Sequence, residues 1–151
     1  MRSLGRFLER GAVLVIDYCY PAREYFHPQR SMGTLACHYR HRVHGDPFYL
    51  PGLQDITAHV DFSALAGAAG AAGLELLGYA HQARFLVNCG ITELLAAEDP
   101  NDAKRYLPAA AAVQKLLSPA EMGELFKVLA VGRGVTGPLL GFASGDRSHA
   151  L

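Results

Sequence analysis

The pattern of apolar and polar positions predicts a strand early in the chain. Residues 12–18, AVLVIDY, form a continuous apolar run, rich in β-branched residues, that ends in Asp17 and Tyr18. Such a run is typical of a strand that is covered on both faces in a parallel sheet. We expect it to be the central strand, with Asp17 and Tyr18 at the sheet edge where ligands collect in open α/β folds.

From residue 61 onward, helical and extended patterns alternate. Asp61 is a good N-cap for a helix over 62–72 that Gly73 ends, and 74–79 has the pattern of a strand. Two short helices are expected next, then a helix with Pro108 in its first turn, a short helix with a capping box at 118–121, and a last strand. The two short helices span 82–89 and 91–97, the helix with Pro108 spans 108–117, and the last strand spans 125–131. Strand, helix, strand, helices, strand indicates an α/β fold.

Residues 19–60 hold no persistent helical or strand period. The segment contains His27, His38, His41, His44 and His59, together with several tyrosines and arginines. Long loops in compact domains are functional or disordered, and the many aromatic residues argue against disorder. We therefore predict a long polar and aromatic loop that folds over a ligand or substrate.

Composition narrows the function classes. A length of 151 residues predicts one compact domain that buries roughly two thirds of its unfolded surface. The formal net charge is +0, which provides no overall attraction to nucleic acid or to an anionic membrane. The cysteines, Cys19, Cys37 and Cys89, suit free thiols in a reducing compartment. No apolar run reaches the ~20 residues of a spanning helix, so the expectation is a soluble, cytoplasmic protein.

The first residues have an unusual pattern for a chain start. Leu4, Phe7 and Leu8 stand at helical spacing and Gly11 resembles a helix end, so the pattern predicts that the sequence begins inside a helix. We expect polypeptide upstream of Met1 in the complete domain.

Two motifs resemble ligand-binding sequences but lack features that such sites require. The segment 132–137, GRGVTG, matches the dinucleotide fingerprint and follows a predicted strand, but Pro138 and the residues after it predict no helix to receive a phosphate. Cys37, His41 and His44 would share one face of a helix, yet their spacing fits no standard zinc pattern. Arg40 and Arg42 would also repel a dication. The plain interpretation is a basic loop whose histidines form hydrogen bonds with neighbouring groups. The alternative is an arginine and histidine patch that binds a carboxylate or pairs with Asp46, Asp55 or Asp61.

The segment 52–62, GLQDITAHVDF, is the strongest candidate site. Asp55, Thr57, His59 and Asp61 stand at every second position, so an extended chain directs them to one side. Ile56, Ala58 and Val60 would then pack on the other side. An acidic recess with one histidine is suited to a cationic group, although Asp61 alone is as well explained as a helix cap.

Several long motifs resemble the carboxyl-terminal half of the MidA family of S-adenosylmethionine-dependent methyltransferases, whose mitochondrial members methylate an arginine on a complex I subunit during its assembly. The motifs are those at 11–18, 27–35, 38–41, 52–62 and 122–129, and the resemblance covers nearly the whole chain. Cys19 stands where the family usually has glycine.

The resemblance implies the fold. The run 12–18 would be the fifth strand of a Rossmann-like class I methyltransferase sheet, 74–79 the sixth, and 125–131 the antiparallel seventh. Residues 1–151 would thus be the carboxyl-terminal half of a domain whose loops that bind S-adenosyl-L-methionine precede Met1, with no cofactor-binding residue in this chain.

The resemblance also implies a mechanism, in which an arginine nitrogen of a protein substrate attacks the sulfonium methyl group. Guanidinium stays protonated, so carboxylates must hold it and assist loss of a proton. We hypothesise that Asp55, His59 and Asp61 act in catalysis. The predicted substrate-binding residues are Asp17, Tyr18, His38, Arg40, His41 and Thr57.

Two readings of function remain open. The first is a methyltransferase that is active with its upstream half. The second is a cofactor-free module that binds a partner protein through residues 19–60. In both, the edge of the 12–18 strand is a site of possible association, because strands one to four would be absent from it.

Overall fold

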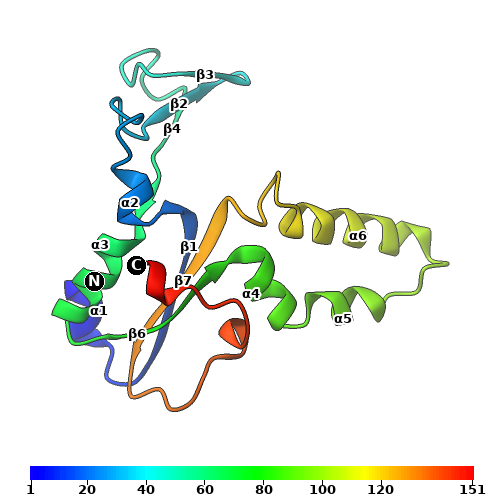
Figure 1. The fold of residues 1–151 in the computed structure, drawn as a ribbon. Helices are drawn as coiled ribbons and strands as arrows, with labels where there is room; N and C mark the ends of the chain where they lie inside the picture. The colour runs from blue at the N-terminus through cyan, green and yellow to red at the C-terminus, as the bar shows by residue number, and fades with distance from the viewer.

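The computed structural model describes all residues 1–151 and has a mixed four-stranded sheet at its centre (Figure 1). The strand order is β5-β1-β7-β6. Strand β7 (Phe126–Arg133) lies between β1 (Gly11–Tyr20) and β6 (Glu75–His81) and runs antiparallel to both. Strand β5 (Val60–Asp61) pairs in parallel with only the end of β1, through Cys19 and Tyr20. The remaining length of that β1 edge is unpaired.

Each face of this sheet has its own apolar cluster. On one face, α3 (Phe62–Ala71) lies over Cys19, Tyr79, Leu129 and Val131, and α1 (Arg2–Phe7) packs against α3. On the other face, Phe142 of η1 (Leu140–Phe142) and Phe85 of α4 (Gln82–Asn88) pack on β6 and β7. The residues that cover this second face do not reach β1, so Leu14 and Ile16 are each 50% exposed. The strand 12–18 therefore has the apolar pattern of a central strand, but only one of its two faces is covered.

A small second sheet stands apart from the first. Strands β2 (Ala36–Tyr39), β3 (Arg42–His44) and β4 (Asp55–Thr57) form an antiparallel sheet in the order β3-β2-β4. It projects from the body near the short α2 (Ala22–Tyr25), at the top of Figure 1. The prediction of a loop without regular structure over 19–60 is therefore wrong. Strands β2 and β3 are four and three residues long, too short to show a period, whereas β4 lies within the two-residue repeat of 52–62.

A helical arm extends from the other end of the sheet (Figure 1). It consists of α4, α5 (Ile91–Ala96) and α6 (Ala103–Leu117), and α6 contains no buried residue. Helix α6 begins five residues before Pro108, which corrects the prediction of a first-turn proline, because Asp102 already accepts the first helical N–H bonds. Residues 118–125 form turns rather than the predicted short helix, since the Ser118 carbonyl accepts from both Glu121 and Gly123.

Other predicted elements are confirmed by the structure. The helix capped by Asp61, the strand after Gly73 and the two short helices around Gly90 all form. Chain ends are close together in Figure 1, and the tail reaches β6 through η2 (Ser148–Ala150). No helix combines the length and hydropathy needed to cross a bilayer.

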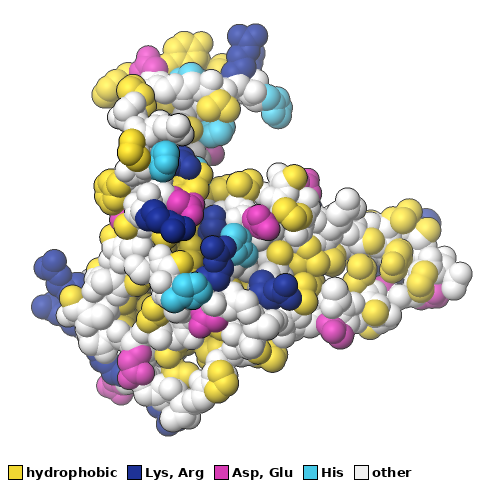
Figure 2. Space-filling model, in the orientation of Figure 1, with side chains coloured by type: hydrophobic (Ala, Val, Ile, Leu, Met, Phe, Trp, Pro, Cys, Tyr) yellow, Lys and Arg dark blue, Asp and Glu magenta, His cyan; other side chains and the backbone are white.

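The molecule is less compact than its length predicts. Its accessible surface is 9955 Å², whereas a monomer of this mass exposes about 7,500 Å². Only 18 residues are buried. The two projecting arms and the half-covered β1 account for this excess, and Figure 2 shows apolar side chains along the helical arm.

Candidate functional site

A cavity of about 620 Å³ lies where the small sheet meets the end of β1. We name it the sheet-edge cavity. Its lining residues are Tyr18, Thr34, Ala36, His38, Asp55, Thr57, Ala58, His59 and Leu125. Five of the predicted site residues are thus brought together, from strands β1, β2 and β4 and from the turn after β4. Thr34 and Leu125 line it too, without any signal in the sequence.

Pairing of β2 with β4 positions the polar side of the cavity. His38 is the register partner of Asp55. The Thr57 hydroxyl donates to the Ala36 carbonyl at 3.4 Å, so its lone pair accepts from Nε2 of His38 at 3.3 Å. Asp55 takes part in neither ion pair of the structure, which join Arg23 to Glu24 and Arg105 to Glu98. Its exposed carboxylate is therefore free to pair with a cation.

His59 is held by aromatic rings and by its backbone. Its ring stacks on Tyr20 at 4.5 Å with an interplanar angle of 18°, and the Tyr18 ring meets it edge-on at 6.0 Å. The backbone N–H of His59 donates to the Thr34 hydroxyl at 3.1 Å. The ring therefore has a defined orientation at the cavity wall.

Burial and neighbouring positive charges favour the neutral form of His59. Burial lowers the pKa of His59, and the positive charges of Arg30 and Lys127 lower it further. The Arg30 guanidinium carbon lies 4.1 Å from the centre of the Tyr20 ring, on which His59 also stacks. A neutral imidazole can accept a proton at pH 7, which is the property required of a general base.

The other predicted residues lie outside this cavity. Asp61 caps α3, since its Oδ1 accepts from the Ala64 N–H at 3.0 Å. The Asp17 carboxylate accepts from the Tyr18 N–H at 2.7 Å. Arg40 lines a second cavity, and the exposed His41 occupies a turn. Of the three residues predicted to pack on the opposite side, Ile56 is 49% exposed and Ala58 lines the cavity itself. Only Val60 packs on a core.

The two motifs that fitted poorly have structural roles. The Arg133 guanidinium donates to the carbonyls of Leu8, Ala72 and Gly73, and so ties α1 and α3 to β7. The next element after it is the short η1, and no α-helix follows that could present a phosphate site. Cys37 and His44 face each other across a hairpin rather than along a helix. No group of three or more metal-binding side chains is assembled.

Buried thiol and phenol groups lie behind the site. Cys19 and Tyr79 approach at 3.9 Å between sulfur and hydroxyl. Burial raises the pKa of Cys19 to about 12 and raises the pKa of Tyr79 as well. Both groups are therefore neutral packing elements, and all three cysteines are free thiols, as the sequence predicted.

Comparison with known proteins gives a consistent set of relatives. A family model described as "Putative S-adenosyl-L-methionine-dependent methyltransferase" matches residues 1–80. The mitochondrial protein arginine methyltransferase NDUFAF7 of Danio rerio is 34% identical over 125 residues, covering 80% of this chain and 27% of the relative. That of Rattus norvegicus is 34% identical over 126 residues, covering 80% and 26%.

Solved structures match over nearly the whole chain. A Burkholderia thailandensis protein bound to S-adenosyl-homocysteine is 63% identical with a TM-score of 0.95, covering 99% of this chain and 39% of that one. A native structure from the same organism is also 63% identical, has a TM-score of 0.95 and is covered to 40%. The chain thus spans about a quarter of the curated relatives and about two fifths of the solved chains.

Proposed function

The chain belongs to the S-adenosyl-L-methionine-dependent methyltransferase family whose model matches residues 1–80, and from this we propose that it forms the acceptor side of such an enzyme. The methyl acceptor would be an arginine of a protein, as the name of the NDUFAF7 relatives states for them. The solved relative bound to S-adenosyl-homocysteine supports this reading over a cofactor-free binding module.

The sheet supports a place for this chain within the larger domain. We assign β1, β6 and β7 as the fifth, sixth and seventh strands of a Rossmann-like class I methyltransferase sheet. The support is β7, which lies between the other two and runs antiparallel to both. The unpaired edge of β1 would receive the fourth strand. The solved chains are longer than this one, which covers 39% and 40% of them, so they have room for the further strands that this assignment requires.

The residues of this chain do not form a cradle for S-adenosylmethionine. Its only G-x-G-x-x-G segment leads to no α-helix, and Arg133 within it is committed to backbone carbonyls. We therefore place cofactor binding in another part of the enzyme and derive no step through the cofactor from these residues.

One observation carries the proposal: an unpaired carboxylate and a neutral histidine line the same cavity. Asp55 would hold the guanidinium group by charge-assisted hydrogen bonds, and the Tyr18 ring would add a cation-π contact. His59 would accept the proton that leaves as the guanidinium nitrogen is methylated. His38 and Thr57 would orient the acceptor. Asp17, Arg40, His41 and Asp61 stay predictions of the sequence pattern, outside the cavity.

The proposal is tested with the complete methyltransferase domain and radiolabelled S-adenosylmethionine. Asp55→Asn removes the charge that holds the acceptor, so arginine methylation should fall by about a hundredfold or more. Asp102→Asn is the matched control, because Asp102 is exposed and makes no side-chain capping bond. Equal rates for the two variants, with intact folding, would remove Asp55 from the site.

A further inference from the structure

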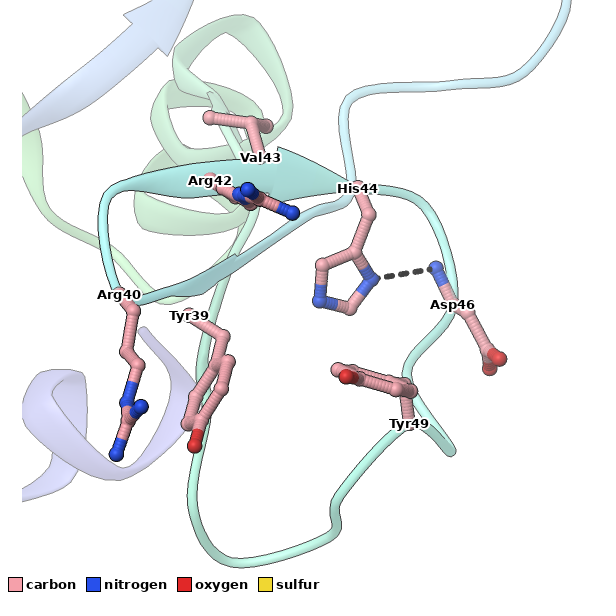
Figure 3. A pocket seen from close by; sticks show the side chains of 7 residues that line it. All are labelled: Tyr39, Arg40, Arg42, Val43, His44, Asp46 and Tyr49. Atoms are coloured by element: carbon pink, nitrogen blue, oxygen red, sulfur yellow. Dashed lines mark hydrogen bonds between the residues drawn. The ribbon is translucent and has the colours of Figure 1, made fainter.

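A second cavity in the small sheet, which no part of the proposed mechanism uses, is built for an anion. It measures about 710 Å³ and lies inside the hairpin and the loop that follows it (Figure 3). We name it the hairpin cavity. The lining residues that matter to its chemistry are Tyr39, Arg40, Arg42, His44, Asp46 and Tyr49. Two arginines against one aspartate give the lining a single excess positive charge.

His44 presents an unused donor inside this cavity. The Asp46 backbone N–H donates to its Nδ1 at 3.3 Å, so that nitrogen is an acceptor and the ring hydrogen is on Nε2. Nε2 is buried and has no partner. Figure 3 shows this nitrogen facing the space between Tyr39 and Tyr49. A buried N–H without an acceptor is costly, so a ligand oxygen that reached it would satisfy this donor.

The cavity walls are rigid and aromatic. Tyr49 meets His44 edge-on at 5.2 Å and Tyr39 at 6.2 Å. The guanidinium carbon of Arg40 lies 5.5 Å from the Tyr39 ring centre. Gln54 donates to the carbonyls of Asp46 and Pro47 and so fixes the loop that carries Tyr49. The Asp46 carboxylate, the one anionic group at the cavity, accepts from the Phe48 N–H at 2.9 Å.

Backbone strain is concentrated around this cavity. The only non-glycine residues with positive φ are Arg40 at 46°, His41 at 63° and Leu50 at 46°. Arg40 and His41 are the two central residues of the β2–β3 turn, where glycine or asparagine is preferred. A non-glycine residue is disfavoured in this region because its Cβ lies too close to the following carbonyl oxygen. Arg40 lines the cavity, and His41 and Leu50 are the chain neighbours of Arg42 and Tyr49, so the strain coincides with the segments that form the cavity.

We infer that the hairpin cavity binds a carboxylate side chain, glutamate or aspartate, of the protein that is methylated. Arg40 and Arg42 would pair with the carboxylate, and the Nε2–H of His44 would donate to one of its oxygens. A single negative charge matches the excess charge of the lining better than a phosphate does. The identity of the partner as the methyl acceptor rests on the proposed function, whereas the carboxylate site stands on the geometry of the cavity alone.

The two cavities lie back to back on the small sheet. His38 faces the sheet-edge cavity and the next residue, Tyr39, faces the hairpin cavity. Consecutive strand residues point to opposite faces. A protein substrate that occupies both cavities must pass round the edge of the small sheet. Its acidic residue and its acceptor arginine are therefore several residues apart in its own sequence.

The experiment measures binding by the full chain in the absence of cofactor. The probe is a decapeptide of glycine and serine with one central glutamate, and the reference peptide has glutamine there. Titration into ¹⁵N-labelled chain at low salt should shift the signals of Arg40, Arg42 and His44 with the glutamate peptide only. Equal binding of the glutamine peptide, or shifts confined to other residues, would overturn the inference.

Variants separate the site from general surface charge. Arg40→Gln and Arg42→Gln should each weaken binding about tenfold or more. Arg23→Gln, a change at an exposed arginine of α2 with 82% side-chain exposure, should leave it unchanged. A loss with Arg23→Gln as large as with Arg40→Gln would contradict a built site.

The donor and the class of anion are tested in the same assay. His44→Leu should weaken binding, and His44→Gln, which returns an N–H near the Nε2 position, should restore most of it. A phosphoserine decapeptide that binds tenfold more tightly than the glutamate peptide would overturn the carboxylate assignment. Because no methyl transfer is measured, failure of the proposed function would leave these outcomes unaffected.

Discussion

At the scale of residues, the sheet-edge cavity brings together an exposed carboxylate, a hydroxyl and an imidazole. The two-residue repeat placed Asp55, Thr57 and His59 on one cavity, because the chain is extended there. The fourth member, Asp61, lies where the chain turns into α3, and capping uses its carboxylate oxygen. His38 joins the site through its pairing with Asp55 across β2 and β4, a long-range register that one sequence does not show.

His59 predicts a pH dependence of stability. Its lowered pKa means that the folded chain binds a proton less readily than the unfolded chain, for which the ordinary value is 6.5. The free energy of unfolding should therefore fall as pH drops below 6.5 toward the lowered pKa, and should not change through this group above 6.5.

The measurement is the urea midpoint between about pH 5 and 7.5. His59→Gln should reduce the slope, while His149→Gln at an exposed position should not. His81, whose pKa burial also lowers, accounts for a residual slope in both variants. An unchanged slope in His59→Gln would show that burial of this imidazole does not oppose its protonation.

At the scale of elements, strong local patterns were predicted and short strands were not. Strands β1, β6 and β7 have long apolar runs, and α3 has a cap at one end and Gly73 at the other. The three-residue strand β3 leaves no periodic signal, whereas β4 lies within the two-residue repeat of 52–62 that predicted an extended chain. The β2–β3 turn is also hidden, because Arg40 and His41 occupy positions where sequence rules look for asparagine or glycine.

The strained hairpin turn gives a prediction about stability. His41→Gly should stabilise the chain by about 1 kcal/mol, because glycine adopts the φ of 63° without steric cost. Gly33→Ala is the converse change, at a glycine with φ 73° and open space around it, and it should destabilise. Chemical denaturation of both variants measures the effect. Destabilisation by His41→Gly would mean that the turn is held by contacts of the His41 side chain.

At the scale of the whole molecule, exposure is the feature that composition could not predict. A length of 151 residues favoured one compact unit, yet the surface is 9955 Å² and half of each of Leu14 and Ile16 is exposed. An unpaired strand edge beside an apolar face promotes pairing with another chain. We therefore expect the isolated chain to associate through β1, the surface at which we place the rest of the methyltransferase sheet.

Association is tested by analytical ultracentrifugation. The double variant Leu14→Lys and Ile16→Lys should shift the chain toward monomer, because lysines on an edge strand oppose edge-to-edge pairing. Leu94→Lys, at a position of α5 that is 72% exposed, is the control and should leave association unchanged. A monomeric unmodified chain would argue against β1 as an interface.

The central claim is that the sheet-edge cavity holds a guanidinium group, and one titration tests it most directly. Acetyl-arginine methylamide added to ¹⁵N-labelled chain should shift the signals of Tyr18, Asp55 and His59, and Asp55→Asn should weaken binding about tenfold. Acetyl-citrulline methylamide, which is neutral and of similar shape, should not bind. Equal binding of the two compounds, or shifts remote from these residues, would contradict the account.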